Sequence, residues 1–319
     1  LPKDSLLWLT ATMKAKGKGL DVFSSGTRAS MEAVVSDIRY GSTSVSEISF
    51  RASLEKQHLS LLLESGYPLA LLKASLEGTL RKNEVNMHLQ AQVDNLNLYR
   101  LHLVDAPLTT VFLLTAEAKS NGKQSHRLEG KLNEWELIGE NQTFYPDEVR
   151  FLAKTSKDST SISFAAGDAH LEMKGNQYIE SLSANLSLLT EKLKEQYKHR
   201  SLDLSAIRSL FPVLSIEAFV GNHNPIQDLL TMQNIKFNEL SLSASTSPLS
   251  GLSGKMAVHS LVKDTLRLDT IRVAAFEDTA GFRLTSELKI NRTRFRKAYS
   301  GKLDGTINDN QAQALLDVT

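Results

Sequence analysis

The sequence predicts a mostly β fold, an elongated, twisted and open sheet that forms a groove, with a short helical insert. Two observations lead to this class. Apolar and polar residues alternate over most of the 319 residues, and successive side chains of a strand point to opposite faces of a sheet. Between residues 179 and 235 the apolar spacing changes to three and four residues, which is typical of helices.

The clearest strand lies at residues 85–103 (VNMHLQAQVDNLNLYRLHL), where five apolar residues occupy alternate positions. The phase of the alternation slips at Asp94-Asn95 and again at Tyr99-Arg100. A one-residue shift would otherwise turn apolar groups into water, so we expect bulges or tight bends at both places. The five alternating residues are Val85, Met87, Leu89, Ala91 and Val93.

The same alternation predicts further strands before the helical region. We expect a loop at residues 14–19 and a break at Gly78, whereas Asn121-Gly122 is a strong signal for a hairpin turn. The cleanest of these strands carries Ile48, Phe50, Ala52 and Leu54. The predicted strands are 5–13, 29–38, 48–54, 59–63, 69–80, 108–119, 127–138, 149–154, 161–165 and 169–174.

Residues 179–235 form the predicted helical insert. Leu186, Leu189, Leu193 and Tyr197 recur on one side of an amphipathic helix. Asp203 or Ser205 can cap a second, short helix. Asn224 followed by Pro225 is a cap with proline at the first helical position, and it opens a third helix. Residues 214–220 between the second and third helices are a candidate strand.

Strands resume after the insert, at residues 237–246, 252–260, 266–275, 282–290 and 298–307. No proline- or serine-rich linker separates the parts. The predicted organisation is therefore one β segment at 1–178, the helical insert at 179–235, and the β segment continued at 236–319.

Composition narrows the class of protein. The net charge of +1 gives no reason to expect a nucleic-acid partner. Cysteine is absent, which excludes disulfides and thiolate sites. Its absence fits an oxidising periplasm, although many cytosolic proteins also lack cysteine. No run of about 20 apolar residues is present to cross a bilayer. The sequence starts and stops within its strand pattern, so we expect an internal segment of a longer protein whose anchor lies outside it.

The sequence contains no motif that predicts catalysis or a cofactor. The eight histidines are scattered, without the paired spacing of a zinc site. The Ser-x-x-Lys matches at Ser53 and Ser120 lie at predicted turns without the other motifs of hydrolases that use that pair. We therefore expect a protein that is not an enzyme and holds no cofactor or metal.

Three arginines, Arg292, Arg294 and Arg296, alternate along one predicted strand face. Such a cluster can contact anionic lipid head groups or an acidic partner. The simpler interpretation is a solvated face that discourages edge-to-edge aggregation.

Two interpretations of the apolar face compete. The strands can close on one another as a sandwich or barrel, with the apolar side as an ordinary core. Alternatively, they form a curved sheet whose inner side stays open as a trough for lipid chains. Periodicity does not separate these. Aromatic residues make up only 7% of the chain, so bulky groups to plug a small barrel are scarce, and the helical insert offers an apolar stripe to cover part of a trough.

Three phrases carry a resemblance to a known family. They are LVDAPLTTVFLLTAEAKSNGKQSHRLEGKL at 103–132, the serine- and leucine-rich run at 234–254, and LRLDTIRVAAFEDTAGFRLTSELK at 266–289. These resemble segments of the large TamB proteins of Bacteroidota, members of the AsmA-like group. The resemblance extends over most of the chain. It depends on the general character of the sequence and on these three segments, and not on catalytic signatures.

Family membership implies a β-taco, a long twisted half-pipe with a hydrophobic lumen, in the periplasm of a diderm bacterium. It implies an inner-membrane anchor outside this segment, phospholipid transfer between the inner and outer membranes, and a BamA-like outer-membrane barrel protein as a possible partner. This segment lacks the anchor and the C-terminal portion typical of the family.

Our hypothesis is a segment that carries phospholipid acyl chains in its groove. Leu186, Leu189 and Leu193 belong to a candidate covering helix, and the sequence leaves open whether this helix plugs the groove or lies at its rim. The alternative function is a scaffold or chaperone that assists assembly of outer-membrane β-barrel proteins by strand-edge pairing, and a closed β-sandwich binding module is a third possibility. The expected groove residues are Ile48, Phe50, Met87, Leu89, Ala91, Val93, Leu240, Leu242, Phe282, Leu284 and Leu288.

Overall fold

The computed structural model describes residues 7–40, 43–199, 203–278, 281–290, 298–308 and 311–319. These residues form 21 strands and three helices, so the described chain is mostly β, as predicted. The chain divides into two compact units, Leu1–Leu152 (unit 1) and Ala153–Thr319 (unit 2). The predicted helical insert at 179–235 lies wholly within unit 2.

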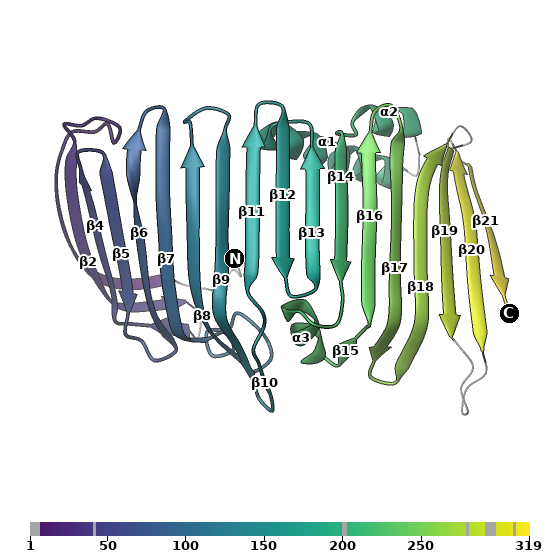
Figure 1. Cartoon of the computed structure of the whole chain (residues 1–319), viewed down its shortest axis with the longest axis horizontal. Coiled ribbons are helices and arrows are strands. Elements are labelled where there is room, and N and C mark those ends of the chain that lie inside the picture. The colour runs from purple at the N-terminus through teal and green to yellow at the C-terminus, as the bar shows by residue number, and fades with distance from the viewer. Residues whose placement is uncertain (1–6, 41–42, 200–202, 279–280, 291–297, 309–310) are drawn as a thin grey trace. The chain divides into compact units, whose positions relative to one another are not determined.

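Unit 1 is an antiparallel sheet in which each long strand pairs with the next one along the chain (Figure 1). β1 pairs with β2 alone among the described residues, so this sheet has a free edge and does not close. Its strands are β1 (Leu7–Lys18), β2 (Arg28–Tyr40), β3 (Thr43–Val45), β4 (Ile48–Glu55), β5 (His58–Ser65), β6 (Ala70–Arg81), β7 (Glu84–Asn97), β8 (Leu108–Ser120), β9 (His126–Gly139), β10 (Thr143–Phe144) and β11 (Val149–Ser156), which runs past the unit boundary.

Unit 2 is also an open antiparallel sheet, and its described helices lie at the strand ends. In Figure 1, α1 and α2 lie at one end of the strands and α3 at the other. Its elements are β12 (Ser159–Ala166), β13 (Ala169–Gly175), α1 (Ile179–His199), α2 (Leu204–Ser209), β14 (Leu214–Val220), α3 (Pro225–Thr231), β15 (Ile235–Lys236), β16 (Glu239–Ser247), β17 (Gly251–Lys263), β18 (Leu266–Asp278), β19 (Gly281–Ile290), β20 (Tyr299–Asn308) and β21 (Gln311–Val318).

The predicted strand at 85–103 is shorter than expected. β7 contains the predicted alternation, and its register with β8 shifts between Val93 and Leu96, which confirms a bulge at the first slip. The second slip lies beyond the end of β7, in a turn where the side chain of Asn97 accepts a hydrogen bond from the Arg100 N–H (2.8 Å). His102 in this turn has φ 56°. The second slip is therefore a tight bend that ends the strand.

Two predicted interruptions are wrong. β1 continues through the expected loop at 14–19 as far as Lys18, because its lysines alternate with Ala15 and Gly17 and pair in register with β2. Gly78 does not break β6 either, since it pairs with Met87 of β7. A Cβ atom at Gly78 would lie 2.2 Å from the Asn86 carbonyl oxygen, so the glycine allows the two strands to approach closely.

The two predicted helix starts are confirmed in detail. Asp203 caps α2 by accepting a hydrogen bond from the Ala206 N–H (2.9 Å), and Asn224 caps α3 by accepting one from the Gln227 N–H (2.9 Å). Residues 214–220 form β14, which pairs with both β13 and β16. The region predicted as a helical insert therefore also supplies a strand to the sheet.

Candidate functional site

In unit 1 the register places the six predicted groove residues on one face of the sheet. Phe50 and Ala91 lie in one row across the strands, and Leu89 lies in the neighbouring row on the same face. Ile48, Met87 and Val93 occupy further rows of this face. We call it the apolar face of unit 1. Its two central rows are Met13, Ala33, Phe50, Leu63, Ala74, Ala91, Leu114 and Leu132, and Ala15, Met31, Ala52, Leu61, Leu76, Leu89, Ala116 and Gly130.

Much of this face remains accessible to solvent. Val93 is buried, whereas Ile48, Phe50, Met87 and Leu89 are only half-buried by their neighbours in the sheet. The described residues of unit 1 contain no helix that could form a second layer. A hollow of about 410 Å³ lies on this face beside the free edge, and the side chains that line it include Ala15, Ala29, Met31, Ala52, Leu54 and Leu59.

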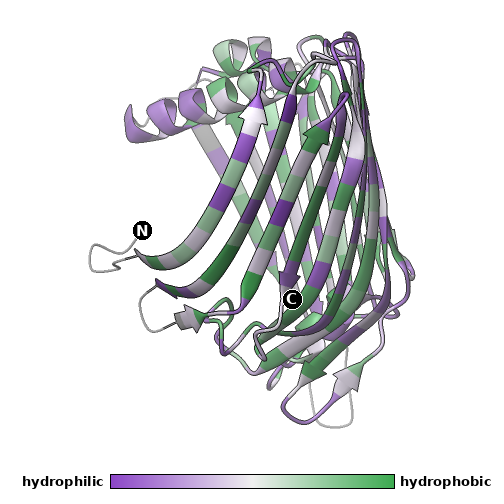
Figure 2. Ribbon diagram, turned by 90° about the vertical axis from the view of Figure 1, so that its left-hand side faces the viewer, coloured by the Kyte–Doolittle hydropathy of each residue, from purple (hydrophilic) through white to green (hydrophobic). Residues whose placement is uncertain are grey.

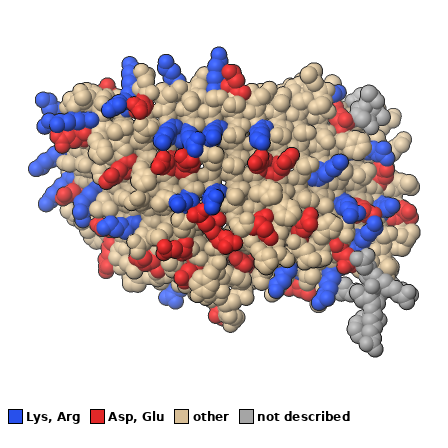
Figure 3. Space-filling view, in the orientation of Figure 1, with Lys and Arg blue, Asp and Glu red and all other residues tan. Residues whose placement is uncertain are grey.

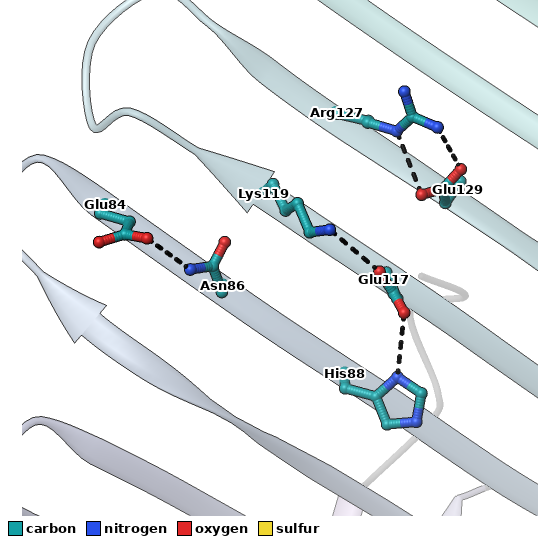
Figure 4. Close-up of polar contacts among 7 residues, drawn as sticks. All are labelled: Glu84, Asn86, His88, Glu117, Lys119, Arg127 and Glu129. Carbon is teal, nitrogen blue, oxygen red and sulfur yellow. Dashed lines mark hydrogen bonds and ion pairs between the residues drawn. The ribbon is translucent and has the colours of Figure 1, made fainter.

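The opposite face of unit 1 is polar and carries a mesh of exposed charges (Figure 4). Glu117 of β8 pairs with Lys119 (3.3 Å) and contacts His88 of β7 (3.9 Å). Arg127 and Glu129 of β9 pair at 2.6 Å, and this hydrogen bond raises the pKa of the Arg127 guanidinium. One face of the sheet is thus adapted to water, and the other presents apolar side chains.

The sheet of unit 1 bends towards its apolar face. Figure 1 shows the first strands of unit 1 curling behind the later ones. Figure 3, drawn from the same side, shows rows of Lys, Arg, Asp and Glu facing the viewer. The strands nearest the viewer in Figure 2 are curved along their length. The apolar side chains of unit 1 therefore line the inside of a bent, open sheet.

Unit 2 contains the other five predicted groove residues, and they also share one face. Leu242 pairs with Met256, and Leu240 pairs with Val258. The register continues through β18 to Leu284 and Leu288 of β19, and Phe282 lies on the same side of that strand. We call this the apolar face of unit 2. One row across it reads Ala218, Leu242, Met256, Val273, Ser286, Leu303 and Leu316.

Helix α1 packs on the apolar face of unit 2 through its N-terminal half. Leu182 is 1% exposed, and a Cβ atom at Gly175 of β13 would lie 3.3 Å from its methyl group. Met173 of the same strand lines a cavity of about 520 Å³ together with Leu182 and Leu186. Further along the helix, the predicted covering residues Leu186 and Leu193 are 37% and 44% exposed, and Leu189 is half-buried. The sheet therefore buries only the N-terminal part of the apolar stripe of α1, and the rest of the stripe stays partly exposed to solvent.

The C-terminal end of α1 is held by the chain that follows it. Gln196 is buried, and its side chain accepts a hydrogen bond from the Asp203 N–H (2.9 Å) and donates one to the Asp203 carbonyl (3.3 Å). Arg208 of α2 then donates to the carbonyl of Leu249 and pairs with Glu277 of β18 (3.6 Å). These contacts fasten both helices to the ends of strands in unit 2.

Unit 2 has a hollow of its own, of about 860 Å³, bordered by charged side chains from β17 to β21 and lined also by the residues Leu242, Met256, Val273 and Leu303. Glu287 receives hydrogen bonds from Lys289 (2.8 Å) and Arg272 (2.9 Å), which hold the pKa of its carboxyl below the usual range. Arg283 does the same for Asp304 through two hydrogen bonds of 3.1 and 2.7 Å. Glu287 and Asp304 are thus paired with neighbouring cations, while residues of the apolar row, including Leu242, also line this hollow.

The three arginines of the predicted anionic contact, Arg292, Arg294 and Arg296, lie outside the described residues. Within the described residues there is no group of three or more His, Asp or Glu side chains that could hold a metal ion. Among the helices that the structure describes, none combines the length and apolar character needed to cross a bilayer.

Several residues of the two apolar faces were not among the groove residues predicted from the sequence. Leu61, Leu76 and Leu114 complete the rows of unit 1, and Met256 and Val273 those of unit 2. Leu76 has polar neighbours on both sides, but the other four residues each stand beside another apolar residue, so the local pattern did not assign them to a face. Assigning them to a common face required the register between strands.

The chain was compared with protein-family models, with curated proteins and with solved structures, and none of the three comparisons finds a match.

Proposed function

We propose that this chain is a lipid-carrying segment of the AsmA-like, TamB type, which holds phospholipid acyl chains against its apolar faces. In this proposal the chain works in the periplasm of a diderm bacterium, as part of an inner-membrane-anchored protein, and supports outer-membrane biogenesis. One observation carries the proposal: each unit presents rows of Leu, Ala, Met, Val and Ile that its own open sheet does not enclose.

Contiguous apolar surface is rare on soluble proteins and marks a site of interaction with something apolar. A hydrocarbon chain suits the apolar face of unit 1 because the central rows offer no hydrogen-bonding side chain. Burial of each methylene is worth about 0.8 kcal/mol and has no preferred direction. The attraction therefore allows a chain to shift along the face without breaking specific bonds.

The first test is mass spectrometry of lipid that copurifies with the chain, combined with transfer of a fluorescent phospholipid between vesicles. We expect Leu89→Glu and Leu242→Glu to lose most bound lipid, because each places a charge in the middle of an apolar face. The matched controls, Gln90→Glu and Ser241→Glu, place the same charge on the polar faces and retain lipid.

Circular dichroism and unfolding curves establish that each variant is folded. Two outcomes would contradict the proposal: a folded wild-type chain that neither copurifies with nor transfers phospholipid, or face variants that behave as their controls do.

The second candidate function is pairing with strands of outer-membrane barrel precursors. The observation that favours it is the free edge of the sheet. Among the described residues β21 pairs with β20 alone, and its Leu315 and Leu316 are 71% and 66% exposed. An open edge of this kind accepts an added strand. Photocrosslinks from β21 to barrel precursors, together with no copurifying lipid, would favour this function over lipid transfer.

A further inference from the structure

The two ends of the strands in unit 1 differ in how they are connected. Because neighbouring strands are antiparallel, successive connections alternate between the two ends. Connections β1–β2, β4–β5, β6–β7 and β8–β9 lie at one end, which we call the turn rim (residues 16–28, 55–58, 81–84 and 119–127). The opposite loop rim holds residues 37–40, 43–48, 64–70, 94–108 and 136–148.

The two rims carry opposite charge. The turn rim contains nine Lys and Arg against three Asp and Glu. The described loop rim contains two Arg against nine Asp and Glu. Figure 3 shows Lys and Arg projecting from the upper edge of unit 1, where Figure 1 places the β6–β7 and β8–β9 turns. The chain as a whole is nearly neutral, so this separation is invisible in its net charge.

Several charges of the turn rim are not engaged by the protein. Lys56, Lys82 and Lys123 are exposed and form no ion pair within the part of the chain that the structure describes. The rim's ion pairs lie at the surface, where such pairs contribute little to stability. They are Arg28–Glu55 (3.6 Å), Arg81–Glu84 (3.2 Å), Lys119–Glu117 (3.3 Å) and Arg127–Glu129 (2.6 Å). The turn rim is thus able to bind external phosphate groups.

The apolar face is longer than one lipid. The 14 residues of β7 span roughly 45 Å at about 3.3 Å per residue. One leaflet of a bilayer has a hydrocarbon thickness of about 15 Å, half of the ~30 Å core. A lipid whose tails lie along the strands therefore covers only the part of the face next to its head group, and its head group belongs to one rim or the other.

We propose that the turn rim of unit 1 is the head-group side of bound phospholipid and that the loop rim excludes the phosphate. This inference rests on the proposed function and adds an orientation to it. Phosphates lie along the Lys and Arg of the turn rim, and acyl chains run from there along the apolar face towards Leu89. Carboxylates such as Asp105, Glu140 and Asp147 repel a phosphate from the other end. The substrate class is a phospholipid with a net negative head group.

Photocrosslinking tests this orientation. One probe is an anionic phosphatidylethanolamine whose amine is acylated with a diazirine, and the other is a phosphatidylglycerol with a diazirine in the acyl chain. We expect the head-group probe to label peptides of the turn rim at least fivefold more than those of the loop rim. The acyl probe labels the middle of the strands, around Leu89.

Charge variants sharpen the test. Lys56→Glu, Lys82→Glu and Lys123→Glu together abolish the preference of the head-group probe for the turn rim. The reverse variant, Asp105→Lys, Glu140→Lys and Asp147→Lys, brings head-group labelling to the loop rim. Lys131→Glu, on the polar face in the middle of β9, is the control and leaves the pattern unchanged. All seven positions are exposed, so the variants are expected to fold.

The outcomes separate the two proposals. Equal labelling of both rims by the head-group probe, or a preference for the loop rim, overturns the orientation while leaving lipid binding intact. If the acyl probe labels no residue of the apolar face, the proposed function itself fails.

Discussion

The described residues of unit 1 contain no helix to lie over its apolar face, whereas the apolar face of unit 2 lies partly under its own helix α1. Both sheets follow the same alternating pattern and the same antiparallel order. The difference comes from one connection, since β13 and β14 are joined through α1 and α2, whereas the described connections within unit 1 contain no helix. A sheet of this kind therefore controls access to its apolar side through its connections, with no change to its strands.

The largest effect is expected where α1 is fastened to the sheet. Leu182→Ala removes a fully buried side chain that packs on Gly175 and should cost about 3 kcal/mol. Hydrogen exchange measured by mass spectrometry should show α1 losing protection while unit 1 is unaffected. Leu188→Ala, at a residue that is 51% exposed, is the matched control and should stay near wild type. Equal loss of protection in both units would contradict the separation drawn here.

A second prediction concerns strand contact in unit 1. Gly78→Ala places a methyl group against the Asn86 carbonyl and Met87, and should destabilise unit 1 by about 1–3 kcal/mol because backbone must shift. The control is Gly301→Ala in unit 2, where an added Cβ meets nothing within 4 Å. Urea unfolding monitored by exchange in β6 and β7 measures the difference. An unaffected Gly78→Ala would show that the two strands are farther apart than described.

The third prediction concerns Asp168, which holds the loop before α3 through hydrogen bonds. Asp168 accepts hydrogen bonds from the His223 N–H (3.0 Å) and the Asn224 side chain, and a Cβ at Gly221 would lie 2.2 Å from its carboxylate. Burial acts to raise the pKa of this carboxyl, but the hydrogen bonds from Asn224 and from the backbone outweigh it and lower the pKa. Asp168→Ala should cost about 2 kcal/mol at neutral pH.

The lowered pKa of Asp168 also determines how its contribution to the free energy of unfolding depends on pH. A carboxyl with a lowered pKa in the folded state adds stability above its unfolded pKa, and that stability is lost as the pH falls through the folded value. The difference between wild type and Asp168→Ala should therefore persist from neutral pH to about pH 4 and shrink below it. Unfolding curves at several pH values measure this, and a difference that grows on acidification would be the wrong sign.

The smallest effect is expected on the polar face of unit 2. Arg283→Gln removes two exposed hydrogen bonds to Asp304 and should leave stability almost unchanged. It should nevertheless raise the pKa of Asp304 towards its ordinary value, since Arg283 is what lowers it. Carboxyl NMR titration tests this. An unchanged pKa of Asp304 would show that the ion pair does not persist in solution.

Sequence alternation was sufficient to predict the two faces of the strands. Phe50, Leu89 and Leu242 were assigned to an apolar side, and each lies on the apolar face of its unit, because the period of two is imposed by strand geometry. The openness expected of the fold is confirmed in each unit by a strand that pairs on one side only, and the closed sandwich is excluded there. The use of these faces for lipid stays a prediction.

The remaining features depend on contacts that no local pattern contains. The cap residues Asp203 and Asn224 predicted helix starts, but the side of the sheet on which α1 packs is decided by Leu182 meeting Gly175. Lysines at 14, 16 and 18 suggested a loop, although alternating lysines suit the polar side of β1 equally well. The charge difference between the two rims of unit 1 emerges only when connections far apart in the sequence are brought to one end.

The rows of unit 1 have a mechanical consequence. Along Phe50, Leu63, Ala74, Ala91, Leu114 and Leu132, large residues are followed by small ones and then by large ones again. Strands are about 4.8 Å apart, so a hydrocarbon guest moving sideways would meet a gently corrugated floor, with a shallow dip at the two alanines.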